Sequence, residues 1–187
     1  LARSMLRFIY QSNLPDFMIC EICFQTDAKE FIMKSLITKI TSSREVTLIT
    51  LESAPSQVGF LSDVFGEVAR QQINVDMISQ SAPTGNTVSV SFTVSDEDMP
   101  KVLKIVKGLS AAYPEVRSMV SSSNVKINLF GENLPAYCGV AAEAFSALKK
   151  QEIDILMITT SDVDISLLIP EAFCENALSA LHEQFSC

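Results

Sequence analysis

Few residues of this chain have the types and spacing that chemistry requires. Cys20 and Cys23 form a C-x-x-C pair, a spacing that occurs in redox and zinc sites. The pair lies in the apolar run FMICEICF, no second pair follows, and His182 is the only histidine. Because a tetrahedral zinc site needs four ligands, we interpret both cysteines as small apolar residues of a buried element. The sequence therefore predicts no metal site.

The other candidates for catalysis have simpler structural explanations. Asp96, Glu97 and Asp98 are consecutive, but carboxylates are favourable in the first turn of a helix, and Ser95 is a typical N-cap. His182 lies near the end of an amphipathic segment with no nucleophile beside it. The sequence has no G-x-x-x-x-G-K-[ST], G-x-G-x-x-G or G-x-S-x-G motif. We therefore predict no catalytic site and no cofactor in this chain.

Composition excludes several classes of partner. The 187 residues are 48% apolar and 19% charged with a net charge of -8, and no basic face suggests nucleic acid. No apolar run approaches the roughly 18 residues that span a bilayer, so we expect no membrane contact. The chain begins without the apolar core of a signal peptide, and five irregularly spaced cysteines fit a reducing compartment. We expect a cytoplasmic protein.

Glycine at two helix starts favours ligand binding. Gly59 and Gly139 each stand where a loop turns into an apolar-periodic segment. A helix start has free N–H groups and the positive end of the dipole, and glycine lets a small anion approach. A metabolite with a carboxylate is a natural ligand; the alternative is that both glycines only relieve crowding against a sheet.

The elements that position these glycines occur twice. Val58–Ser81 and Cys138–Ser161 align without a gap from Val58 opposite Cys138 onward, so the chain contains two copies of one unit. The first copy is expected to contain strands and helices in the order β-α-β-β-α-β: strands at Glu45–Glu52, Val75–Ser81, Thr87–Val94 and Glu115–Ser121, and helices beginning near Gly59 and Asp96.

The second copy lacks its last strand. Its expected elements are strands at Val125–Phe130, Ile153–Thr159 and Asp164–Ile169 and helices at Gly139–Gln151 and Glu171–Gln184. Since an unpaired sheet edge is unfavourable, we expect Ser35–Ile40 to cross over and complete this sheet. The predicted fold is α+β, with two ferredoxin-like units, the first inserted in the second. The expected divisions are an N-terminal segment of open role (1–33), a completing strand and linker (34–44), the first unit (45–121) and the second unit (122–187).

The repeat resembles the ACT domain, and the region from Glu45 to Phe185 resembles the regulatory region of aspartate kinase (aspartokinase). The resemblance is carried by GFLSDVFGEVARQQINVDMISQS at Gly59–Ser81, CGVAAEAFSALKKQEIDILMITTSDVDIS at Cys138–Ser166 and ALSALHEQF at Ala177–Phe185. It implies feedback control of an ATP-dependent kinase that phosphorylates aspartate, in aspartate-family amino-acid biosynthesis. The implied partners are lysine or threonine as effector, a second copy in a homodimer through ACT units, and a kinase catalytic domain or subunit.

The resemblance also implies which residues bind the effector. The N–H groups at the first helix start would hold its carboxylate, and two residues on and after the second strand would meet its amino group or side chain: Ser56, Gln57, Val58, Gly59, Phe60, Leu61, Asp76 and Gln80. Many family members have an acid at Ser56 and proline at Val58, whereas GFLSDVFG is closer to lysine-sensing members. The alternatives are a structural ACT dimerisation module without ligand, or an ACT module of another amino-acid enzyme or of a transcription regulator.

Overall fold

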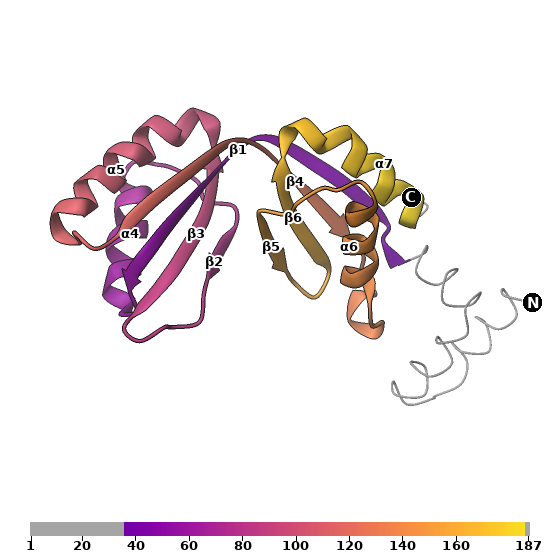
Figure 1. The fold of residues 1–187 in the computed structure, drawn as a ribbon, viewed down its shortest axis with the longest axis horizontal. Helices are drawn as coiled ribbons and strands as arrows, with labels where there is room; N and C mark the ends of the chain where they lie inside the picture. Colours follow the sequence, from indigo (N-terminus) through magenta and orange to yellow (C-terminus); the bar gives the residue numbers. More distant parts are fainter. Residues whose placement is uncertain (1–35, 186–187) are drawn as a thin grey trace, which may run out of the picture.

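The computed structural model describes residues 36–185 (Figure 1). The Cys20–Cys23 pair and the segment 1–33 lie outside the described residues. The elements follow in this order: β1 (Lys39–Pro55), α4 (Val58–Arg70), β2 (Ile78–Gln80), β3 (Thr87–Ser95), η1 (Asp96–Asp98), α5 (Met99–Ala112), β4 (Arg117–Phe130), η2 (Leu134–Ala136), α6 (Val140–Lys150), β5 (Met157–Thr160), β6 (Asp164–Pro170), η3 (Glu171–Phe173) and α7 (Cys174–Phe185).

All six of these strands form one antiparallel sheet in the order β2-β3-β1-β4-β6-β5. The long strands β1 and β4 run through both halves of the molecule, so each half contains a four-stranded sheet. Helices α4 and α5 lie on the outer side of one half, which we call the first unit, and α6 and α7 on the outer side of the second unit (Figure 1). Each half is a ferredoxin-like unit, and the predicted fold class is confirmed.

The strand that completes the second unit comes from the start of β1. Lys39 and Ile40 pair with Phe130 and Leu129 of β4, so the predicted crossover is confirmed for these residues. The expected start at Ser35 is not described, and the strand begins at Lys39. Its early part belongs to the second unit and its late part to the first, which places the first unit inside the second.

The sequence predicts separate strands where the structure has two continuous ones. Ser35–Ile40 and Glu45–Glu52 are parts of β1, and Glu115–Ser121 and Val125–Phe130 are parts of β4. The pairing register shifts between Ser43 and Leu48, and Glu45 and Ser123 have φ of 60° and 58°. These irregularities bend the paired strands over the top of the molecule without ending them (Figure 1).

Each unit has its own core beneath its two helices, because alternate strand residues point toward the helices. In the first unit this face includes Ile49, Leu51 and Phe92, all 0% exposed. In the second unit it includes Ile127 and Leu129, also 0% exposed. The opposite faces carry no helix, and the two helix-free faces turn toward each other beneath the bend (Figure 1).

The edge strands are shorter than expected. The segment 75–81 forms a strand only at Ile78–Gln80, and the segment 153–159 forms one at Met157–Thr160. Ile73 and Ile153 instead follow the helices and insert into the cores, where they are 6% and 5% exposed. These two apolar residues therefore pack in the cores and take no part in strand pairing.

The acidic run at residues 96–98 forms a helix start, as predicted. Ser95 accepts a hydrogen bond from the Glu97 N–H at 3.3 Å, and Thr47 donates to the carboxylate of Asp96. The acidic residues lie in the short turn η1, which leads directly into α5.

Candidate effector site

The predicted carboxylate-binding residues, Ser56–Leu61, form one corner at the start of α4. Gln57 is the extended N-cap residue, with φ -78° and ψ 138°, and its side chain makes no capping hydrogen bond. The Phe60 N–H donates to the Gln57 carbonyl at 3.1 Å. Val58 and Gly59 are exposed, and the first turn contains no acidic residue. The N–H groups of Val58 and Gly59 and the positive helix end therefore face solvent.

An aromatic contact fixes this corner. The side chain of Phe60 is buried, and its ring meets the ring of Tyr113 edge-on at a centroid distance of 5.0 Å. The Tyr113 hydroxyl donates to Asp63 Oδ2 at 2.6 Å, and this hydrogen bond raises the pKa of Tyr113. The contact joins α4 to the end of α5, so the exposed N–H groups sit on a rigid support.

Asp76 and Gln80 lie away from this corner. Ser56 donates its N–H to the carbonyl of Asn86 at 3.0 Å, whereas Asp76 donates its N–H to the carbonyl of Thr93 at 3.2 Å. Asn86 and Thr93 are seven residues apart along an extended segment, a separation of about 23 Å. Gln80 ends the edge strand β2, is exposed and pairs with Val90, which is four residues, or about 13 Å, along the chain from Asn86. The structure thus groups Ser56–Leu61 and separates them from the two other predicted residues.

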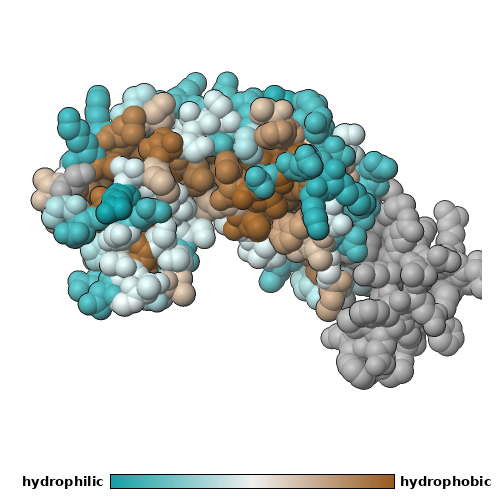
Figure 2. Space-filling model, viewed as in Figure 1, coloured by the Kyte–Doolittle hydropathy of each residue, from teal (hydrophilic) through white to brown (hydrophobic). Residues whose placement is uncertain are grey.

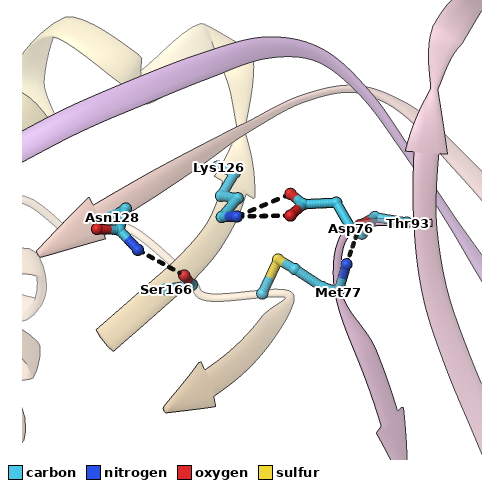
Figure 3. A network of polar contacts seen from close by, with 6 residues as sticks. All are labelled: Asp76, Met77, Thr93, Lys126, Asn128 and Ser166. Atoms are coloured by element: carbon cyan, nitrogen blue, oxygen red, sulfur yellow. Dashed lines mark hydrogen bonds and ion pairs between the residues drawn. The ribbon is translucent and has the colours of Figure 1, made fainter. Parts of the chain in front are cut away.

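The carboxylate of Asp76 is held by a lysine of the second unit. Lys126 Nζ lies 2.8 Å from both Oδ1 and Oδ2 of Asp76 (Figure 3). The side chain of Lys126 is 19% exposed and that of Asp76 is 47% exposed. The pair joins the segment before β2 to the middle of β4, and it ties the two units together.

Apolar and polar contacts surround this pair. The Met77 N–H donates to Thr93 Oγ1 at 3.0 Å, and Asn128 Nδ2 donates to Ser166 Oγ at 3.0 Å (Figure 3). Next to them lies an apolar cluster from both units, which we call the apex cluster: Val46, Leu48, Met77, Met157 and Leu168. Figure 2 shows apolar side chains gathered over the junction, while polar ones cover much of the outer surface.

The two edge strands lie near each other below the apex cluster. An open hollow of about 290 Å³ lies between them, lined by Ser79, Ser91 and residues 155–158. Ile78 and Ile158 on these strands are 51% and 41% exposed. Both strands keep one unpaired backbone edge in the described chain, which is a surface suited to another strand.

The start of α6 differs from the start of α4, although the sequence predicts both as anion sites. Gly139 is the N-cap with φ 100°, a conformation that favours glycine. The first turn contains Glu143, whose charge already compensates the helix dipole. The α4 start is therefore the better place for a carboxylate.

Lys126 was missed by the sequence analysis. The strand pairings match it with Leu48 of the other copy, so one copy has a cation where the other has an apolar residue. That interruption of the repeat was a detectable signal. The partner of Lys126 was not predictable, because Asp76 lies 50 residues away and the ion pair forms only where the two units meet.

Among residues 36–185, no group of three His, Cys, Asp or Glu side chains could hold a metal ion. None of the helices in this range has the length and apolar composition needed to cross a membrane.

Comparison with known proteins agrees with this architecture. ACT-domain family models match residues 47–111 and 127–185, which defines a protein with two ACT domains. A crystal structure of aspartokinase alpha and beta subunits is 30% identical and has a TM-score of 0.74; the match covers 81% of this chain and 99% of that one. The chain belongs to the aspartokinase family.

Two further structures define which part of the family it resembles. The ligand-free regulatory subunit of aspartate kinase from Thermus thermophilus is 29% identical with a TM-score of 0.73, and the match covers 81% of this chain and 99% of that one. E. coli aspartokinase III, solved in complex with lysine and aspartate, is 30% identical with a TM-score of 0.62 over 82% of this chain and 33% of its own. The chain spans about two fifths of the length of the curated aspartokinases it matches.

Proposed function

We propose that this chain is the amino-acid-sensing module that gives feedback control to an aspartate kinase. The observation that carries the proposal is the match to regulatory subunits along nearly their whole length. The kinase reaction belongs to a catalytic domain or subunit that partners this module, in the cytoplasm. The module shifts that partner toward a less active arrangement when an end product binds.

The start of α4 is the proposed position of the effector's carboxylate. Its two exposed N–H groups, at Val58 and Gly59, and the absence of an acid in the first turn support this placement. We propose lysine as the effector, since its second ammonium group can pair with a carboxylate such as Asp76, and threonine has no second cation. The lysine complex of E. coli aspartokinase III is consistent with this choice.

A second copy of the chain must complete the site. Asp76 lies about 23 Å along the unit from the α4 start, which is longer than a lysine molecule. We therefore propose that Asp76 and Gln80 approach the effector from the partner copy of a homodimer, assembled through ACT units. The exposed edge strands β2 and β5 offer the surface for that assembly.

Calorimetry with lysine tests the carboxylate position. Gly59→Asp places a negative charge at the helix start, and Gly59→Asn has nearly the same shape without the charge; no atom lies within 4 Å of a Cβ at this position. We expect Gly59→Asp to weaken lysine binding at least tenfold relative to Gly59→Asn. Ala142→Asp, at the exposed start of α6, serves as the control and should leave the affinity unchanged.

Asp76→Ala tests the cation position. We expect it to weaken lysine binding by about 1.5–3 kcal/mol, the range for a hydrogen bond to a charged group. Sedimentation should show a species larger than the 20.5 kDa monomer. Equal lysine affinity in Asp76→Ala, or a strictly monomeric chain, would contradict this arrangement.

A structural dimerisation module without ligand is the second candidate. It is favoured by the neutralisation of Asp76 by Lys126 and by the lack of an acid at Ser56. If the chain dimerises but calorimetry shows no heat with millimolar lysine or threonine, the structural module is the correct candidate. If only threonine gives heat, threonine is the effector in place of lysine.

A further inference from the structure

The two units have the same topology, and individual backbone hydrogen bonds of one unit recur in the other. The strand order reads the same from both edges once β2 is matched with β5, β3 with β6 and β1 with β4. Asp76 donates its N–H to the Thr93 carbonyl, and Leu156, its counterpart in the second copy, donates its N–H to the Leu168 carbonyl at 2.8 Å. Positions around the apex cluster can therefore be compared pairwise.

This comparison shows that the ion pair has no counterpart in the repeat. Asp76 corresponds to Leu156 in the register that aligns Val58 with Cys138. Lys126 pairs with Leu168 of β6, and Leu48 pairs with Thr93 of β3, so Lys126 corresponds to Leu48. One side of the apex thus has a lysine and a carboxylate where the other has two aliphatic residues. Met77 and Met157 also correspond, and these two identical residues lie together in the apex cluster.

An ion pair at this place behaves differently from an aliphatic contact. Asp76 is half exposed, so salt and charged solutes reach the pair, whereas an apolar contact does not respond to them. A partly exposed pair shifts an equilibrium by no more than about fivefold. Such a contact holds one arrangement and still allows a modest competing interaction to release it.

We propose that the Asp76–Lys126 pair is a releasable electrostatic latch that sets the angle between the two ACT units. With the pair formed, the segment before β2 is held against β4 and the helix-free faces stay close. With the pair released, the bend in β1 and β4 lets the units move apart about the apex cluster. The latch is a property of the resting chain and needs no effector.

The test measures the distance between the units directly. Spin labels are attached to unnatural amino acids at Lys107 and Glu183, exposed positions on α5 and α7, so the native cysteines stay intact. Labelled chain is diluted with unlabelled chain, so that distances within one chain dominate. For the otherwise unaltered chain we expect a narrow distribution of distances between the two labels. In the Asp76→Asn and Lys126→Met variants, the population at longer distances should be up to fivefold larger.

A double variant separates the latch from a general loss of stability. Asp76→Leu with Lys126→Leu reproduces the residues of the other copy, Leu156 and Leu48, and it should restore the narrow distribution. Its distribution should also stay constant between 0.05 and 1 M salt, while that of the native latch broadens.

A pair elsewhere in the chain provides the control. Lys101 and Asp98, 2.6 Å apart on the surface of the first unit, form a similar ion pair within one unit. Lys101→Met should leave the distribution unchanged. Identical distributions for the native chain and both single latch variants, or equal broadening in Lys101→Met, would overturn the proposal. Neither result depends on lysine binding at α4, so the proposed function is judged separately.

Discussion

Gly131→Ala tests whether the start of the described chain closes the second unit. A Cβ at this position would lie 2.0 Å from the backbone oxygen of Leu36 and 3.1 Å from its carbonyl carbon. Leu36 is 4% exposed and belongs to the core of the second unit, and Thr38 donates its N–H to the carbonyl of Phe130 at 2.8 Å. The methyl group therefore meets the backbone of a buried residue that is followed directly by a paired segment.

The cost follows from how far the backbone must move. A contact of 2.0 Å has to lengthen by more than 1 Å, and the obstacle is a main-chain carbonyl rather than a flexible side chain. Overpacking costs typically about 1–3 kcal/mol, and an obstacle in the main chain places this substitution at the upper end, about 3 kcal/mol. At roughly 2–4 °C per kcal/mol for a chain of this size, we expect Tm to fall by about 6–12 °C in thermal unfolding followed by circular dichroism.

Gly66→Ala is the matched control, because the substitution is the same and the surroundings differ. Gly66 lies inside α4, and no atom lies within 4 Å of a Cβ built there. Alanine is favoured over glycine in a helix by roughly 0.5–1 kcal/mol, so Tm should rise by about 1–4 °C. A Gly131→Ala protein as stable as the native chain would refute the placement of Leu36, and with it the closure of the second unit by the preceding segment.

Two further predictions concern buried polar groups. Asn124 Nδ2 donates to the carbonyls of Val46 and Ser121 at 3.0 and 2.7 Å beside the bend. Asn124→Ala should therefore lower the free energy of unfolding in urea by about 2–3 kcal/mol. A loss below about 0.5 kcal/mol would contradict this prediction. Burial raises the pKa of Cys174, so its contribution to stability is present below its unfolded pKa of about 8.5 and is lost as pH rises through the higher folded value. Urea unfolding from pH 7 to 10 should therefore show a steeper loss of stability in the native chain than in Cys174→Ala, and parallel curves would count against this reasoning.

The internal repeat was sufficient to predict the two units and the insertion of one in the other. A constant offset matches the first helix and the following strand segment of the two copies, and the missing last strand indicated that an earlier segment must fill its place. The continuity of β1 and β4 was not predicted. Arg44 and Glu45 are typical of a break, yet the chain passes through them as a bulge with Glu45 at positive φ. Backbone strain of this kind is supported by neighbouring strands and leaves little trace in residue types.

The candidate site was predictable only where it is local. Ser56–Leu61 are consecutive, so a loop followed by a helix start places them together without knowledge of the tertiary structure. Asp76 and Lys126 meet because two units fold toward each other across 50 residues of chain. A contact of that kind depends on the angle between units, which periodicity does not determine.

The distance between these two features limits how the proposed module could act on a kinase partner. A ligand can change the balance between two arrangements only if it interacts differently with each of them. A carboxylate bound at Val58 and Gly59 of one copy touches the first unit alone, about 23 Å from the latch, and it meets the same groups whether the units are close or apart. Such binding would stabilise the first unit and leave the angle at the apex unchanged. Control therefore requires that the effector also contact a second copy, whose position depends on that angle, or that its ammonium compete with Lys126 for Asp76. Both routes assign the regulatory effect to the dimer, and a monomeric variant that still binds lysine is expected to show no change in the distance between its units.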